Sequence, residues 1–114
     1  MIVGVLGGGQ LGRMLALAGR PLGLRFRFLE PGRPAPVDDL GDIVRAAYDD
    51  ASALVRFGEG LGAVTYEFEN VPDASARYLA ETLPVRPPPA ALEFARDRLH
   101  EKEGFARLEI PATP

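Results

Sequence analysis

Short runs of apolar residues alternate along the chain with segments in which apolar residues recur every three or four positions. The first run, residues 2–6, is separated by three glycines from a segment with helical spacing. Runs at 24–29, 42–46 and 63–68 predict three more strands, and a short strand is expected around Val85. Strands that alternate with helices at short spacing predict an α/β fold with a doubly wound parallel sheet of four to five strands.

Four segments with helical spacing predict the helices between and after these strands. The first follows the three glycines, carries Leu11 and Leu15, and should end at Gly19. Asp49 or Asp50 is expected to cap the second helix, which should end near Gly58 because glycine commonly terminates helices. The two remaining helices are expected at 72–79 and 90–107.

Composition limits the class of protein. A chain of 114 residues, 46% hydrophobic and 25% charged, is typical of one soluble globular domain. The net charge of −3 provides no excess of cations for a nucleic acid or an anionic membrane, so neither is expected as a partner. No apolar run is long enough to span a bilayer, and no basic leader precedes the first strand, so we expect a cytoplasmic protein.

The types of side chain present further limit which functional sites the chain could form. The chain has no cysteine and one histidine, His100, which excludes thiolate catalysis and metal sites built from cysteine or several imidazoles. No metal site is predicted in this segment. Gln10 and Asn70 are the only two amide side chains, and each lies within one of the two motifs that follow.

Three glycines, Gly7, Gly9 and Gly12, occur in a G-x-G-x-x-G pattern that follows a strand and opens a helix. Exposed backbone N–H groups and the helix dipole favour a phosphate at such a loop, although a tight turn without a ligand has the same pattern. Glu30 ends the second strand, where dinucleotide-binding domains keep the acid that binds a ribose. The motif alone therefore leaves open an NAD(P)-binding Rossmann domain of an oxidoreductase, or a structural role for Glu30.

A second motif, T-Y-E-F-E-N at residues 65–70, overlaps the end of the predicted strand at 63–68. If the strand continues through it, Thr65, Glu67 and Glu69 share one face. Two carboxylates at the carboxyl end of a strand repel each other unless they hold hydroxyls, an amine or a cation, or are solvated at an edge strand. Because parallel strands end at one edge of a sheet, we expect Glu67 to lie beside residues 7–12.

A cluster of charges lies in the last predicted helix. Arg96, Arg98 and Lys102 follow one another at helical spacing, with Asp97 and Glu101 beside them. This pattern alone is typical of a solvated helix face with ion pairs between successive turns.

Four segments follow one another along the chain: G-G-G-Q-L-G-R-M at 7–14, T-Y-E-F-E-N-V-P at 65–72, D-R-L-x-x-K at 97–102 and I-P-A-T at 110–113. In their order and spacing, these segments resemble the N5-carboxyaminoimidazole ribonucleotide synthetases of the ATP-grasp superfamily. Formyl-transferring relatives share the glycine loop but carry an acid at the position of Gln10, which favours the carboxylating family.

The resemblance implies a fold, a domain division and an activity. Residues 1–108 should form the Rossmann-like pre-ATP-grasp domain that binds the substrate, and 109–114 a linker toward an ATP-grasp domain beyond this chain. The family carboxylates 5-aminoimidazole ribonucleotide with ATP and bicarbonate, in de novo purine (IMP) biosynthesis. We expect no catalytic residue in this segment, and an isolated chain without ligase activity.

The resemblance also implies roles for individual residues. Gly9, Gln10 and Leu11 would hold the ribonucleotide, and Glu67 would contact its ribose or its amine. Glu69 would share this pocket or support it. Arg98 would reach toward the phosphates of ATP, whereas most contacts to ATP and Mg²⁺ would come from the ATP-grasp domain. The family further implies a homodimer.

Overall fold

Four parallel strands form one sheet in the computed structural model, which describes residues 1–68 and 71–90. The spatial order is β3-β2-β1-β4, and all three pairs are parallel. The predicted α/β class and strand number are therefore confirmed. The strands are β1 (Ile2–Leu6), β2 (Arg25–Leu29), β3 (Asp42–Val44) and β4 (Ala63–Tyr66).

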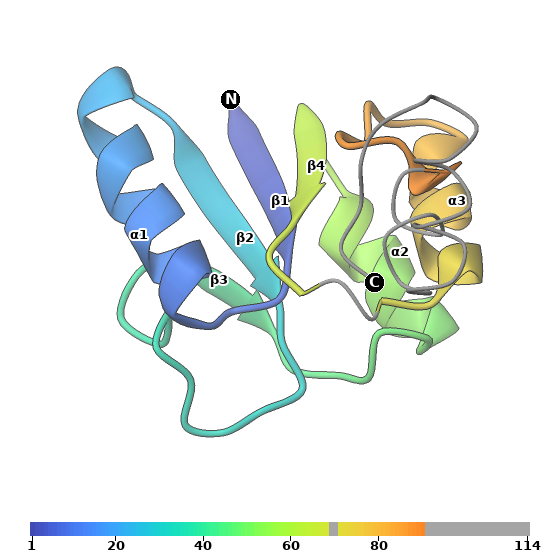
Figure 1. Cartoon of the computed structure of the whole chain (residues 1–114), viewed down its shortest axis with the longest axis horizontal. Helices are drawn as coiled ribbons and strands as arrows, with labels where there is room; N and C mark the ends of the chain where they lie inside the picture. Colours follow the sequence, from blue (N-terminus) through green and yellow to red (C-terminus); the bar gives the residue numbers. More distant parts are fainter. Residues whose placement is uncertain (69–70, 91–114) are drawn as a thin grey trace, which may run out of the picture.

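Within residues 1–68 and 71–90, the helices α1 (Gln10–Gly19), α2 (Ala51–Gly58) and α3 (Asp73–Ala80) pack against the two faces of this sheet. Figure 1 shows α1 on one face, and α2 and α3 on the other, as the doubly wound prediction requires. A short 3-10 turn, Arg20–Leu22, follows α1. In the part of the chain that the structure describes, no helix combines the length and the apolar character needed to cross a membrane.

The predicted ends of two strands were wrong. β4 ends at Tyr66, two residues early, because the N–H groups of Glu67 and Phe68 both donate to Leu6 O, at 2.8 and 3.2 Å. Leu6 is the last residue of β1 and pairs with Tyr66, so β1 has no further residue with which β4 could continue the pairing. Glu67 therefore does not share a strand face with Thr65. β3 likewise ends at Val44, before the predicted position 46.

Two further predicted elements differ from expectation or fall outside the described residues. Val85 makes an isolated parallel bridge with Val64 in place of a fifth strand. Its neighbours extend the contact, since Val64 N donates to Pro84 O at 2.8 Å and Arg86 N donates to Val64 O at 2.9 Å. The predicted helix at 90–107 lies almost entirely beyond the residues that the structure describes.

The helices on the two faces of the sheet bury side chains of different size. On the face covered by α2 and α3, large side chains such as Phe57 and Leu79 are buried. On the other face, the sheet and the loop after β2 supply most of the bulk, through residues such as Phe28 and Val37. There α1 buries only small residues, namely Gly12, Ala16 and Gly19.

Candidate ligand-binding site

Glu67 lies against the glycine loop at the carboxyl end of the sheet. A Cβ atom added to Gly9 would overlap Glu67 Oε1, and one added to Gly7 would lie 2.6 Å from Oε2. Such contacts are much shorter than any that real Cβ atoms make, so the carboxylate occupies the space that glycine leaves open. The structure thus brings Glu67 together with residues 7–12. The sequence analysis predicted this proximity, because parallel strands end at one edge of a sheet.

The protein's own packing restricts two of the three successive glycines, Gly7 and Gly8. Gly7 has a φ of +108°, which other residues rarely adopt, in addition to its contact with Glu67. A Cβ atom on Gly8 would lie 2.6 Å from Val37 Cγ2. The sequence motif suggested a close approach of a ligand to this loop, whereas the described close approaches are made by Glu67 and Val37.

Glu30 closes the glycine loop from the other side. Its Oε1 accepts a hydrogen bond from Gly8 N at 2.8 Å, and its Oε2 accepts one from Gly32 N at 2.6 Å. Each oxygen of this carboxylate therefore already has a backbone donor, which supports the structural role among the alternatives for Glu30. A ribose of a dinucleotide would have to compete with these two hydrogen bonds.

Helix α1 begins beside Glu67 without a side-chain cap. Gly9 is its N-cap residue and provides no side chain to accept from the first turn, and Arg13 N donates to Gly9 O at 3.0 Å. The N–H groups of Gln10 and Leu11 belong to the first turn, which has no acceptor within its own helix. These amides and the positive end of the helix dipole are suited to an anionic or oxygen-rich group of a ligand.

Two aromatic residues adjoin this site, and the sequence analysis missed the contribution of both. The rings of Tyr48 and Phe68 are stacked, with centroids 5.4 Å apart and an interplanar angle of 21°. Burial raises the pKa of the Tyr48 phenol, and the charges of Glu30 and Glu67 raise it further. Phe68 lies within the T-Y-E-F-E-N motif, whereas the signal for Tyr48 in the sequence was its place just before the predicted cap of the second helix.

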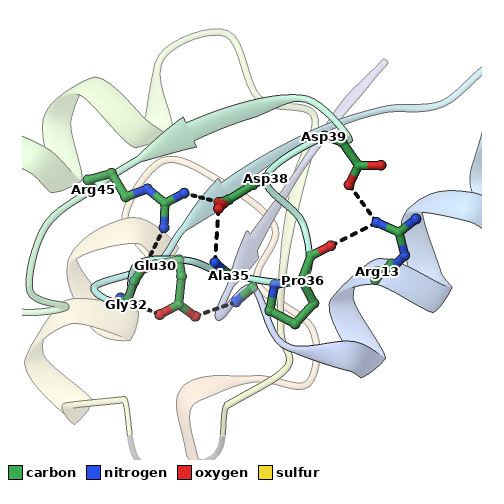
Figure 2. A network of polar contacts seen from close by, with 9 residues as sticks. Arg13, Glu30, Gly32, Ala35, Pro36, Asp38, Asp39 and Arg45 are labelled. Atoms are coloured by element: carbon green, nitrogen blue, oxygen red, sulfur yellow. Dashed lines mark hydrogen bonds and ion pairs between the residues drawn. The ribbon is translucent and has the colours of Figure 1, made fainter.

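A polar network holds the loop after β2 in place beside the site, as Figure 2 shows. Arg13 of α1 donates to Pro36 O at 2.8 Å and to Asp39 Oδ1 at 2.5 Å. The hydrogen bond from Arg13 to Asp39 and the charge of Arg13 hold the pKa of the Asp39 carboxyl below its usual range. Arg45 donates in the same network to Asp38 and to the carbonyl oxygen of Gly32. The loop that positions Gly32 against Glu30 is thereby tied to α1 and to the end of β3.

Two predicted site residues are not described by the structure. Glu69 and Arg98 lie outside the described residues. Within residues 1–68 and 71–90, no group of three histidine, cysteine, aspartate or glutamate side chains could hold a metal ion.

Two cavities in the described part of the molecule lie away from the glycine loop. One, of about 260 Å³, lies beside Arg20 and Asp42, and the other, of about 280 Å³, lies between α2 and α3.

The fold and the site define a Rossmann-like domain that presents a glycine loop, a helix N-terminus and a carboxylate at one edge of a parallel sheet. Residues 1–96 match the family model of the ribonucleotide synthetase pre-ATP-grasp domain. The chain belongs to this family, and this result agrees with the resemblance seen in the motifs. It does not support the oxidoreductase alternative.

Relatives and solved structures of this family are similar over nearly the whole chain. The N5-carboxyaminoimidazole ribonucleotide synthase of Pseudomonas aeruginosa is 48% identical over 111 residues, which is 97% of this chain and 31% of the relative. The crystal structure of N5-carboxyaminoimidazole ribonucleotide synthetase from Thermus thermophilus is 57% identical, with a TM-score of 0.94, over 98% of this chain and 31% of that one.

A ligand complex is among the similar structures. N5-carboxyaminoimidazole synthase from Aspergillus clavatus, in complex with ADP and 5-aminoimidazole ribonucleotide, is 26% identical with a TM-score of 0.86, over 99% of this chain and 31% of that one. The chain thus spans about a third of the length of the relatives it matches.

Proposed function

We propose that this chain is the N-terminal, substrate-binding domain of an N5-carboxyaminoimidazole ribonucleotide synthetase, a cytoplasmic ligase of purine biosynthesis. The observation that carries the proposal is the position of the Glu67 carboxylate against Gly7 and Gly9, beside the uncapped start of α1. Hydrogen-bond acceptors and donors converge there at the end of the sheet where α/β folds bind ligands. The similarity to synthetases along 97% of the chain supports the same assignment.

In the proposed site, two kinds of group hold 5-aminoimidazole ribonucleotide. The backbone at Gly9, Gln10 and Leu11 binds its phosphate or another oxygen-rich group, because first-turn N–H groups lack acceptors. The Glu67 carboxylate accepts hydrogen bonds from a ribose hydroxyl or from the exocyclic amine. Glu69 shares or supports this pocket.

The proposed reaction divides between this domain and the rest of a protein of the relatives' length. ATP transfers its γ-phosphoryl group to bicarbonate, which gives ADP and carboxyphosphate. The amine of the ribonucleotide then attacks the carboxyl carbon, loses a proton, and releases inorganic phosphate. We assign Mg²⁺ and most contacts to ATP to the remainder of the protein, as the resemblance to the synthetase family implies.

We further propose that residues 1–108 form this domain and that 109–114 lead toward the ATP-grasp domain. Arg98, near the end of the proposed domain, binds the phosphates of ATP, for which a guanidinium is well suited. The domain itself orients the ribonucleotide and supplies no group that transfers the phosphoryl or carboxyl group.

The test uses a protein of the relatives' length that carries this chain, called the full-length ligase. Glu67→Gln keeps the size of the side chain but removes its charge, so we expect the KM for the ribonucleotide to rise about tenfold or more and the KM for ATP to change little. Arg98→Ala should have the reverse selectivity. Steady-state assays of ADP release, dependent on bicarbonate and on the ribonucleotide, measure both constants.

Glu81→Gln is the matched control for this test, because Glu81 is an exposed glutamate at the end of α3. It should leave both constants unchanged. A Glu67→Gln variant that raised the two KM values equally would contradict the assigned role of Glu67.

We also propose that the full-length ligase is a homodimer and that α1 contributes to the contact. Leu11, Met14 and Leu15 lie on one side of α1 and are 66%, 63% and 41% exposed. Soluble monomers rarely expose contiguous apolar patches of large side chains, and a second copy would cover this one.

Sedimentation of the full-length ligase tests the homodimer. Met14→Lys combined with Leu15→Lys should give a monomer with an unchanged melting temperature at low protein concentration. Val55→Lys places the same charge at an exposed position of α2 and should leave the dimer intact. A doubly substituted protein that remained a dimer would contradict the role given to α1.

A further inference from the structure

Tyr48 is placed at the Glu67 end of the sheet by contacts on both of its sides. Its carbonyl oxygen accepts a hydrogen bond from Ser75 Oγ at 2.7 Å, and Ser75, in α3, is only 3% exposed. Two residues later, Asp50 caps α2 by accepting from Ala53 N at 3.0 Å. The backbone of Tyr48 is therefore held by α2 and α3 together.

The ring of Tyr48 is tied to the end of β1 through Phe68. The two rings are stacked 5.4 Å apart, and Phe68 N donates to Leu6 O at 3.2 Å. Phe68 also lies on the glycine loop, because a Cβ atom added to Gly7 would lie 3.0 Å from its Cβ. A side chain held in this way on both sides loses little conformational freedom when its hydroxyl binds a ligand.

The chemistry of the phenol complements that of the neighbouring carboxylates. A tyrosine hydroxyl keeps its proton at neutral pH, and burial, together with the charges of Glu30 and Glu67, raises the pKa of Tyr48 further above its ordinary value of 10.0. The negative charges also favour the orientation in which the hydroxyl hydrogen faces them. Both oxygens of Glu30 already accept from backbone N–H groups, so we assign the hydrogen bond from a ligand to Glu67.

A sugar hydroxyl fits a site that offers a phenol as donor and a carboxylate as acceptor. It donates its own hydrogen to a carboxylate and accepts from a phenol through its lone pairs. The amine of an aminoimidazole fits less well, because its lone pair is delocalised into the ring and accepts poorly.

We propose that Tyr48 is a further substrate-binding residue, whose hydroxyl donates a hydrogen bond to the ribose hydroxyl that Glu67 binds. This inference rests on the proposed function and names which part of the substrate Glu67 contacts. It also explains why the aromatic pair lies at the carboxyl end of the sheet.

The test is Tyr48→Phe in the full-length ligase, which keeps the ring and its stacking on Phe68. Loss of one hydrogen bond should raise the KM for the ribonucleotide about three- to tenfold, with kcat, the KM for ATP and the melting temperature unchanged. Tyr78→Phe is the matched control, because Tyr78 is a 43% exposed tyrosine on α3 to which we assign no contact with the substrate. It should change none of these values.

Substrate analogues that lack the 2′- or the 3′-hydroxyl group complete the experiment. For the analogue that lacks the contacted hydroxyl, wild type and Tyr48→Phe should have equal KM values. If the wild type binds the ribonucleotide and Tyr48→Phe binds it equally well, Tyr48 has no such role. If the difference persists with both analogues, the hydroxyl group is not the partner of Tyr48. If the wild type does not bind the ribonucleotide at all, the proposed function itself fails.

Discussion

Helices α1 and α2 cover opposite faces of the same sheet and are built in opposite ways. Helix α1 buries Gly12, Ala16 and Gly19, whereas α2 buries large side chains, with Phe57 fully buried. A Cβ atom on Gly19 would lie 2.5 Å from Phe26 Cζ, so the side chains of the sheet reach the backbone of α1. The α2 face gains its stability from side chains of the helix, and the α1 face from a close approach of the helix to the sheet.

The two helices also begin differently. Asp50 caps α2 by accepting from Ala53 N at 3.0 Å, whereas α1 begins at Gly9 without a side-chain cap. The first-turn amides of α2 are therefore partly satisfied by the chain itself, while those of α1 remain for solvent or a ligand. The start of α2 is thus stabilised by its own cap, whereas the start of α1 offers the amides that the proposed site uses.

Among the substitutions that test the difference between α1 and α2, Phe57→Ala should cause the largest loss of stability. Removal of a fully buried ring from α2 should lower the free energy of unfolding of the chain by about 3–5 kcal/mol. Urea unfolding followed by circular dichroism measures the change. Val55→Ala, at a half-exposed position of the same helix, should change the free energy by less than about 0.5 kcal/mol. Similar losses for the two variants would show that α2 does not supply the core in this way.

A smaller loss is expected when a side chain of α1 is enlarged. Ala16 is fully buried against the sheet, so Ala16→Leu should destabilise the chain by about 1–3 kcal/mol through overpacking. Ala18→Leu adds the same atoms at an exposed position of α1 and serves as the control in the same urea experiment. If Ala16→Leu were neutral, the close contact between α1 and the sheet would not be needed.

The smallest of the expected losses of stability comes from removal of the cap of α2, and its size depends on pH. Hydrogen bonds from Ala53 N and from the Ser52 hydroxyl lower the pKa of Asp50 from its ordinary value of 3.8. The stability that this carboxylate contributes is therefore fully present above pH 3.8 and is lost as the pH falls through the lowered native pKa.

Asp50→Ala tests this pH dependence against Asp49→Ala, the neighbouring exposed carboxylate. Asp50→Ala should be less stable than the wild type at neutral pH, and the difference should shrink in acid, as followed by urea unfolding at several pH values. A difference that did not change with pH would mean that the charge of Asp50 does not contribute to the cap.

The local sequence was sufficient to predict some elements and part of the site. An apolar run that ends in three glycines predicted β1 with its observed bounds, Ile2–Leu6, and Asp50 was one of two predicted caps for α2. The proximity of Glu67 to the glycine loop was also predictable, because parallel strands that end at one edge bring their following residues together.

Features that depend on a neighbouring strand or loop could not be predicted. The alternation of residues 63–68 continues past Tyr66, but β4 ends there because its partner β1 ends at Leu6. The apolar spacing in α1 predicted a helix correctly but did not reveal that small residues face the sheet. Tyr48 was missed because its place at the site depends on stacking with Phe68, a contact between segments that lie apart in the sequence.

The double hydrogen bond of Glu30 has a consequence for protein engineering. In this chain the acid at the end of β2 joins Gly8 to Gly32, so it organises the loop that a designer would want to reshape. Redesigning the domain to accept a dinucleotide would therefore require new donors and acceptors for both amides before the acid could be released. A simple transplant of a coenzyme-binding motif onto this scaffold should loosen the turn rather than create a new specificity.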